Sequence, residues 1–333
     1  MNYIGSKLKL CQNFIPSTIK SVCGDDLSQK IFCDIFAGTG IVGRTFKTSV
    51  KKVISNDVEY YSYILNKNYI ENHLEINNKK ELIEELNQQP LLKNGFIYKN
   101  YCLGGSGERQ YFSDENGQKI DSIRTKIEEW KKDRQITDNM YYFLLCSLLE
   151  CADKVANTTS VYGAYLKHLK KSAQKLFVLE PAEYEINDNQ HIVYNKDANV
   201  LINEIEGDIL YLDPPYNTRQ YGANYHLLNT IAEYKPFIPK GKTGLRTYAR
   251  SKYCTANVVR NEFEYLIKNA KFNYIFLSYN NEGLMSIDDV MNIMSKYGHY
   301  DLVQTEYQRF KADANRFNKT NTTIEYLHIL EKY

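Results

Sequence analysis

The stretch "IFCDIFAGTGIVGRTF" (residues 31–46) decides the fold of the first part of the chain. It begins with a short β-rich run over 31–36, passes through a glycine turn, and continues in a pattern that predicts a helix at about 41–48. The segment "VISND" (53–57) predicts a second strand that ends in an acid. A strand, a glycine turn, a helix and another strand form a βαβ unit, which predicts a parallel α/β sheet.

A second decisive stretch is "YLDPPYNTRQY" (residues 211–221). The apolar residues 209–212 predict an interior strand, and the prolines that follow end it because they remove backbone donors and fix φ. Asp213 is therefore expected at the carboxyl end of a strand, next to a rigid corner. Ligands of open α/β sheets bind at the carboxyl ends of strands, so this position predicts a ligand site.

The distribution of strand and helix patterns predicts two domains. Strand patterns occur before residue 74 and return after about 191, at 191–194, 208–212, 273–278 and 324–330. The segment between them is polar and mostly helical, with a long helical pattern at 138–156. We therefore predict a catalytic domain made of 1–74 and 181–333, and an inserted subdomain at 75–180.

Composition limits the classes of function. Hydrophobic residues make up 43% and charged residues 25% of the 333, and the formal net charge is only +2, so a nucleic-acid surface must be a local patch. Seven cysteines without a C-x-x-C pair argue against a disulfide framework or a zinc cluster, and predict a reducing cytoplasm and no metal. We find no apolar run that is long enough to cross a membrane.

The glycine turn, the proline corner and two further acids predict a nucleotide-like ligand. Gly38 and Gly40 let the backbone approach a ligand closely, and Asp57 follows at a second strand end, where acids commonly bind ribose hydroxyls. Asp197 lies just past another strand. Asp57 and Asp197 have an alternative interpretation as simple helix N-caps.

Four motifs in this order resemble the DNA adenine-N6 methyltransferases of the D12 class (α group, Dam-like) found in restriction–modification systems. They are "NYIGSKLKL" at 2–10, "DIFAGTG" at 34–40, Asp57, and "DPPY" at 213–216. The resemblance implies a Rossmann-like S-adenosylmethionine-dependent methyltransferase sheet with helices on both faces and an inserted, mostly helical DNA-recognition subdomain. The chain departs from the pattern in the long stretch after "DPPY" and in the missing proline after the acid of "DIFAGTG".

The resemblance also implies which residues bind S-adenosylmethionine. Lys7 would face the methionine carboxylate, Asp57 the ribose hydroxyls and Asp197 the adenine amine. The alternatives are that Lys7 is a solvated surface lysine and that Phe36 belongs to the core. The complete set of expected cofactor-binding residues is Tyr3, Gly5, Lys7, Asp34, Phe36, Ala37, Gly38, Gly40, Asp57 and Asp197.

The expected catalytic residues are Asp213, Pro214, Pro215 and Tyr216. The exocyclic amine of adenine is a poor nucleophile, and the Asp213 carboxylate with the Pro214 carbonyl can hold both of its hydrogens. Tyr216 can stack on the base, which must leave the duplex to reach the site.

A basic stretch at 240–252 contains no acid and predicts phosphate contacts. Tyr253 beside it is expected, like Tyr248, to support an unstacked base. The run 167–175 is read either as a helix along the DNA backbone or as a solvated helix face. The expected DNA-binding residues are Lys240, Lys242, Arg246, Tyr248, Arg250, Lys252, Lys170 and Lys171.

The resulting hypothesis is a cytoplasmic enzyme that methylates adenine N6 within a specific sequence of double-stranded DNA, in functional association with a restriction endonuclease. Two alternatives stay open at this point. One is methylation of cytosine N4 or of an RNA base, and the other is a catalytically inactive DNA-binding homologue.

Overall fold

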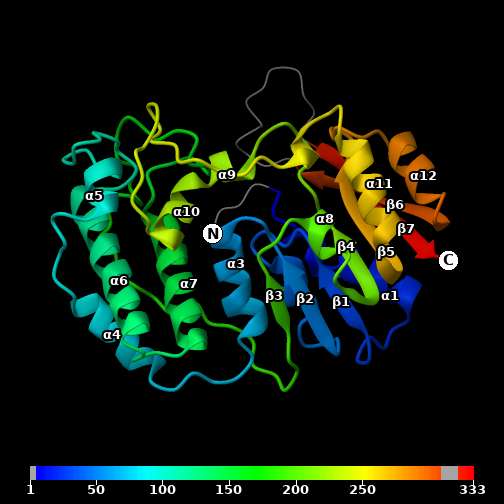
Figure 1. Cartoon of the computed structure of the whole chain (residues 1–333), viewed down its shortest axis with the longest axis horizontal. Coiled ribbons are helices and arrows are strands. Elements are labelled where there is room, and N and C mark those ends of the chain that lie inside the picture. The colour runs from blue at the N-terminus through cyan, green and yellow to red at the C-terminus, as the bar shows by residue number, and fades with distance from the viewer. Residues whose placement is uncertain (1–4, 309–321) are drawn as a thin grey trace. The chain divides into compact units, whose positions relative to one another are not determined.

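The computed structural model describes residues 5–308 and 322–333 (Figure 1). The chain divides into two compact units, which we call the sheet unit and the helical unit. The sheet unit comprises Gly5–His73, Asn187–Gln220 and Arg250–Tyr333. Within the described residues, the helical unit comprises Leu74–Ile186 and Tyr221–Ala249. The helical unit therefore includes 221–249 in addition to the stretch for which an inserted subdomain is predicted.

The sheet unit is built on one seven-stranded sheet with the order β3-β2-β1-β4-β5-β7-β6. Strands β1 to β5 run parallel to one another, whereas β7 is antiparallel to both β5 and β6. Because β2 lies on one side of β1 and β4 on the other, the order of the strands reverses between β1 and β4, where such sheets bind ligands. The strands are β1 (Ile31–Asp34), β2 (Lys52–Asn56), β3 (Ile192–Tyr194), β4 (Glu206–Leu212), β5 (Lys271–Asn280), β6 (Gly298–Gln308) and β7 (Thr322–Lys332).

Alternation along the strands gives this sheet two apolar faces. Phe32 and its neighbour Ile209 lie in one apolar cluster, and the next residues, Cys33 and Leu210, lie in the other. Helices α1 (Phe14–Cys23) and α2 (Ile41–Phe46) pack on the first face, and α8 (Ala198–Leu201), α11 (Val259–Asn269) and α12 (Ile287–Met294) on the second (Figure 1). The predicted α/β sheet with helices on both faces is confirmed.

Four short elements complete the description of the sheet unit. Helix α3 (Tyr60–Asn66) follows β2 and continues into a π-helical turn, Lys67–Glu71. The 3₁₀ turns Leu10–Gln12 and Lys252–Cys254 precede α1 and α11.

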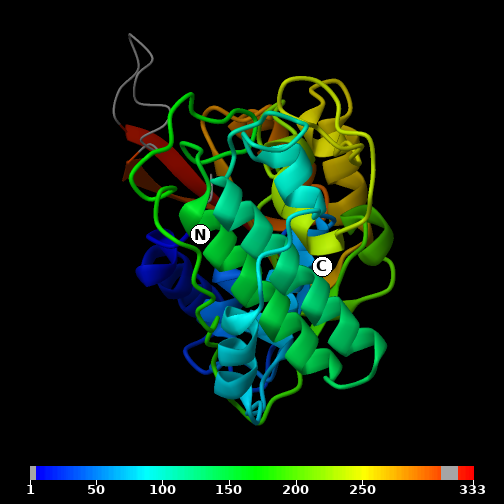
Figure 2. The same cartoon turned by 90° about the vertical axis from the view of Figure 1, so that its left-hand side faces the viewer.

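The helical unit is organised around two long helices, α6 and α7, which lie against one another (Figures 1 and 2). Each begins at a hydroxyl N-cap: Ser113 accepts a hydrogen bond from the amide of Asn116, and Thr137 from that of Met140. None of the helices in the described parts of the chain has the length and apolarity needed to span a bilayer. The helices of this unit are α4 (Lys79–Gln88), α5 (Phe96–Tyr101), α6 (Asp114–Lys132), α7 (Asp138–Val155), α9 (Tyr221–Asn224) and α10 (His226–Glu233).

One strand was missed and one local expectation was wrong. Strand β6 was not predicted, because an edge strand that pairs only with β7 carries no continuous apolar run. Residues 167–175 form turns instead of a helix. The amide of Lys170 donates to Oδ1 of Asn157 at 3.0 Å and its Nζ donates to the Thr158 carbonyl at 2.6 Å, so local polar contacts replace helical ones.

Candidate active site

The glycine loop after β1 is held open by a side chain from α3. Gly38 and Gly40 have φ of 52° and 76°, and a Cβ on Gly40 would lie 2.6 Å from Oδ1 of Asn66. Asn66 donates through Nδ2 to the Gly38 carbonyl at 3.0 Å, and its Oδ1 accepts from Ser55 at 2.8 Å. This role of Asn66 was not predicted, because a lone asparagine in a helical pattern has no distinctive signature.

Asp57 lies one residue past β2 and fixes the same loop from the other side. Its Oδ2 accepts from the amide of Gly38 at 2.8 Å, and its Oδ1 accepts from the amide of Glu59 at 2.8 Å. Burial raises the pKa of Asp57 to about 6, although these two amides lower it. A carboxylate oxygen has two acceptor positions, so both oxygens retain capacity for a hydroxyl donor.

Asp34, the last residue of β1, is almost completely buried, and neither carboxylate oxygen has a hydrogen-bond partner among the described residues. Burial raises its pKa well above the ordinary value, and the nearby charges of Asp213 and Asp57 raise it further. Its environment therefore disfavours the charged form. The acids at the ends of β1, β2 and β4, which are Asp34, Asp57 and Asp213, thus lie near one another at one edge of the sheet.

The proline corner places Asp213 directly after β4. Pro214 is buried, whereas the side chain of Asp213 keeps 21% of its surface exposed. The carbonyl of Tyr216 accepts from the amide of Leu284 at 2.9 Å, and the Tyr216 ring meets Tyr279 edge-on. The corner is thus held by backbone and ring contacts, while its carboxylate stays partly exposed.

Lys7 is the cation of the site. It is 6% exposed, so the alternative of a solvated surface lysine was wrong. Its Nζ lies 3.3 Å from Oδ1 of Asp213 and 2.5 Å from Oε1 of Glu325, which also accepts from Ser278 at 2.7 Å. Burial lowers the pKa of Lys7, but Asp213 and Glu325 raise it well above the ordinary lysine value. Glu325 and Ser278 were not recognised in the sequence because they belong to strands without a motif.

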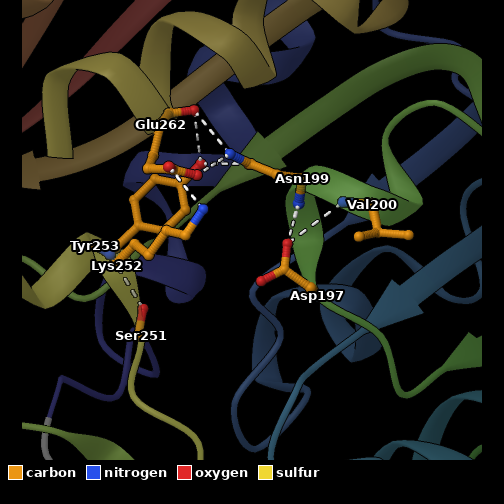
Figure 3. A network of polar contacts seen from close by, with 7 residues as sticks. All are labelled: Asp197, Asn199, Val200, Ser251, Lys252, Tyr253 and Glu262. Carbon is orange, nitrogen blue, oxygen red and sulfur yellow. Dashed lines mark hydrogen bonds and ion pairs between the residues drawn. The ribbon is translucent and has the colours of Figure 1, made fainter. Parts of the chain in front are cut away.

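Asp197 caps α8 through one oxygen, Oδ1, which accepts from the amides of Asn199 and Val200 (Figure 3). The N-cap interpretation is therefore correct for this residue, and its Oδ2 is not used in the cap. Asn199 in turn donates to Oε2 of Glu262 at 2.7 Å, which links α8 to α11.

Tyr253 closes this network against the glycine loop. Its hydroxyl donates to Oδ1 of Asn199 at 2.8 Å (Figure 3), and its ring meets that of Phe36 edge-on at 5.0 Å. Because Tyr253 is buried, the expectation that it supports an unstacked base was wrong. Lys252 beside it donates to Oε1 of Glu262 at 2.9 Å.

The basic stretch is divided between the two units. Lys240 pairs with Leu245 in a tight turn, to which Arg109 donates at the carbonyls of Gly241 and Lys242. The helical unit holds Lys170, Lys171, Lys240, Lys242, Arg246 and Tyr248, and the sheet unit holds Arg250 and Lys252. The guanidinium of Arg246 forms an ion pair with Glu233 at 2.8 Å.

The remaining expected cofactor residues differ in burial and in backbone conformation, and one of them is not described by the structure. Gly5 has a positive φ of 78°, Ala37 is buried after β1, and Phe36 is half-buried. Tyr3 lies outside the described residues.

The chain matches known proteins over nearly its whole length. A family model described as "D12 class N6 adenine-specific DNA methyltransferase" matches residues 3–293. The type II methyltransferase M.NlaIII of Neisseria lactamica is 64% identical over 100% of this chain and 99% of that protein.

More distant relatives carry the same kind of name. The type II methyltransferase M.CviAII of Paramecium bursaria Chlorella virus 1 is 38% identical over 98% of this chain and 97% of its own length. The type II methyltransferase M.FokI of Planomicrobium okeanokoites is 39% identical over 100% of this chain but 53% of its own length. These matches favour adenine over the cytosine and RNA alternatives. The chain belongs to the D12 class of N6 adenine-specific DNA methyltransferases, which transfer a methyl group from S-adenosylmethionine to the N6 amine of adenine in DNA.

Proposed function

We propose that Asp213 and the carbonyl of Pro214 hold the N6 amine of a target adenine within a specific double-stranded DNA sequence. The observation that carries this proposal is the unused acceptor capacity of Asp213, whose carboxylate is partly exposed at the carboxyl end of β4 and contacts Lys7 on one side only. Two acceptors on one amine favour a more tetrahedral nitrogen, which is the geometry that a nucleophile needs. Pro215 fixes the corner, and Tyr216 stacks on the base.

The residues around the glycine loop fit S-adenosylmethionine, which supplies a methyl group on a sulfonium when it is bound. Gly40 at positive φ adds no side chain to the loop, Asp57 retains acceptor positions for ribose hydroxyls, and Asp197 retains Oδ2 for an amine. Gly5, Lys7, Asp34, Phe36, Ala37 and Gly38 complete the proposed set, together with Tyr3 from outside the described residues. No metal enters this scheme.

The target base reaches Asp213 only after it has left the duplex. Extrusion costs a few kcal/mol, which stacking on Tyr216 and hydrogen bonds to the base edge partly offset. Phosphate contacts from the basic residues named above fix the register of the DNA, and base-edge contacts from the stretch 75–180 provide the sequence specificity.

The biological role that fits this activity is protection of host DNA in the cytoplasm against a partner restriction endonuclease. The support comes from the names of the relatives, type II methyltransferases and modification methylases.

The test is incubation of the full chain with tritiated S-adenosylmethionine and unmethylated duplex DNA, followed by digestion to nucleosides. We expect the label in N6-methyladenine of DNA, at a fixed sequence. Label in methylcytosine, in RNA alone, or at random adenines contradicts the proposal.

The cofactor site has its own test in a pair of glycines. Gly40→Ala places a methyl group 2.6 Å from Asn66, whereas at Gly24, which also has a positive φ (94°), an added Cβ has nothing within 4 Å. We expect Gly40→Ala to weaken S-adenosylmethionine binding by about tenfold or more beyond Gly24→Ala, measured by calorimetry. Equal binding by the two variants contradicts the placement of the cofactor at this loop.

A further inference from the structure

Glu325 is a buried carboxylate at a position that no motif covers. It lies on β7, beyond residue 293, where the family match ends, and only 3% of its surface is exposed. A buried charge is costly unless it is paired and hydrogen-bonded. Here Ser278 on β5 and Lys7 both donate to Oε1, so two partners stabilise the carboxylate.

The ammonium of Lys7 lies at unequal distances from its two carboxylate partners. Its Nζ is 2.5 Å from Glu325, a hydrogen-bond distance, but 3.3 Å from Asp213. Glu325 is buried and fixed by the sheet, where it lies opposite Asn280 of β5, whereas Asp213 is partly exposed at the proline corner. The shorter contact of the ammonium is therefore with the carboxylate that has no access to substrate, although the charges of both carboxylates stabilise the ammonium.

From this arrangement we infer that Glu325 is a positioning residue, which holds Lys7 beside Asp213 and keeps it from closing on the carboxylate that accepts the adenine amine. The inference rests on the proposed function of Asp213. Without the charge of Glu325, the buried ammonium has one anionic partner left in this group, and it moves onto Asp213. A direct Lys7–Asp213 ion pair then occupies the acceptor that the N6 hydrogen requires.

A change in the pH dependence of transfer follows from the charges around Asp213. Burial raises its pKa to about 6, Lys7 lowers it and Glu325 raises it. Removal of the Glu325 charge therefore lowers the pKa of Asp213 by two routes, loss of repulsion and closer approach of Lys7. The titratable groups that face Asp213 are Lys7 and Cys11 before α1, Asp34 of β1, Tyr211 of β4 and Glu325 of β7.

The other groups on this side of the sheet do not compete with this effect. Burial raises the pKa of Cys11 to about 12 and that of Tyr211 well above its ordinary value, so both are uncharged between mildly acidic and mildly alkaline pH. Burial also raises the pKa of Asp34 and so disfavours its charged form. The charges that change the state of Asp213 in this range are those of Lys7 and Glu325.

The experiment compares Glu325→Gln with Glu331→Gln in the full chain. Glu331 lies on the same strand but is exposed, so its variant removes an equal charge without touching the group. Transfer of tritiated methyl to unmethylated plasmid DNA is measured from about pH 5 to about pH 9, as kcat and kcat/KM. For Glu325→Gln we expect kcat to fall by about tenfold and the acidic limb of kcat/KM to move to lower pH by about half a unit or more.

The outcome separates this inference from the proposed function on which it rests. We expect Glu331→Gln to leave the acidic limb in place. If the limb also stays in place in folded Glu325→Gln, or moves to higher pH, the role of Glu325 is overturned. Asp213→Asn is measured in parallel: if it retains transfer, the proposed function of Asp213 is wrong. If it is inactive while Glu325→Gln behaves as wild type, only the inference about Glu325 is wrong.

A second pair of variants covers the case in which Glu325→Gln does not fold. Ser278→Ala removes one hydrogen bond to Glu325 and leaves every charge in place, so we expect a smaller shift of the limb in the same direction. Glu325→Asp retains the charge and is expected to restore the wild-type limb more closely than glutamine does. The inference is contradicted if Ser278→Ala leaves the acidic limb unchanged. It is also contradicted if Glu325→Asp displaces the limb as far as Glu325→Gln does.

Discussion

Each unit of the molecule contains an aspartate whose pKa is raised to about 6 by desolvation: the partly exposed Asp213 in the sheet unit and the buried Asp121 in the helical unit. Asp121 lies on α6 and accepts three hydrogen bonds, from the amides of Ile97 and Tyr98 at 2.8 and 2.7 Å and from the hydroxyl of Tyr234 at 2.5 Å. Asp213 contacts Lys7 at 3.3 Å and otherwise accepts no hydrogen bond from the described residues.

The difference shows that a raised pKa alone does not identify a functional carboxylate. Both acids are shifted mainly because burial penalises the charged form. The acceptor positions of Asp121 are used by α5 and by a tyrosine, so its role is structural. Those of Asp213 are largely free and partly exposed, which is what a substrate donor requires.

The strongest test of the comparison is Asp213→Ala. We expect methyl transfer to fall by at least about 1,000-fold, because the acceptor for the amine is lost, while S-adenosylmethionine binding survives. Transfer is measured with radiolabel and binding by calorimetry. Loss of cofactor binding with an intact fold contradicts the role assigned to Asp213.

Lys7→Met tests, through the pH dependence of methyl transfer, whether Asp213 is the group that accepts the amine. Asp213 must be ionised to accept the amine, so kcat/KM falls as the pH falls through its pKa of about 6. Removal of the adjacent cation raises this pKa, and we expect the acidic limb to move to higher pH by about one unit. A limb that does not move shows that Asp213 is not the titrating group, and KM for the cofactor reports any separate effect of Lys7 on binding.

Asp121→Asn tests the other side of the comparison. An amide has one acceptor oxygen where the carboxylate has two, so a buried amide of α5 is left unpaired, at a cost of about 1–3 kcal/mol in the free energy of unfolding. Denaturant unfolding measures the loss. We expect the folded variant to keep the acidic limb of the wild type, and a displaced limb would assign a catalytic role to Asp121.

Tyr234→Phe is the mildest probe. It removes one of the three donors to Asp121 and leaves the two backbone donors in place. We expect a loss of about 1 kcal/mol in the free energy of unfolding, with unchanged kcat. Stability equal to the wild type would show that the hydroxyl contributes nothing to holding Asp121.

Much of the sheet was predictable because its signals are local. The parallel strands that frame the site follow apolar runs with glycine, acid or proline at their ends, and β1, β2 and β4 lie within a few residues of the expected positions. The edge strand β6 was missed, since its sequence, GHYDLVQTEYQ, contains no strong apolar pattern. The run 167–175 was misread because its lysines fit a helical surface, whereas Asn157 binds the backbone there.

The sequence by itself determined the strand–turn–helix order, the glycines at positive φ and the acids at strand ends, because each depends on neighbouring residues. Only the tertiary structure decided which charges meet. Lys7 and Glu325 are 318 positions apart, and no periodicity or spacing relates them. Their contact exists because β7 enters the sheet beside β5, which brings a carboxylate from near the end of the chain to a lysine near its beginning.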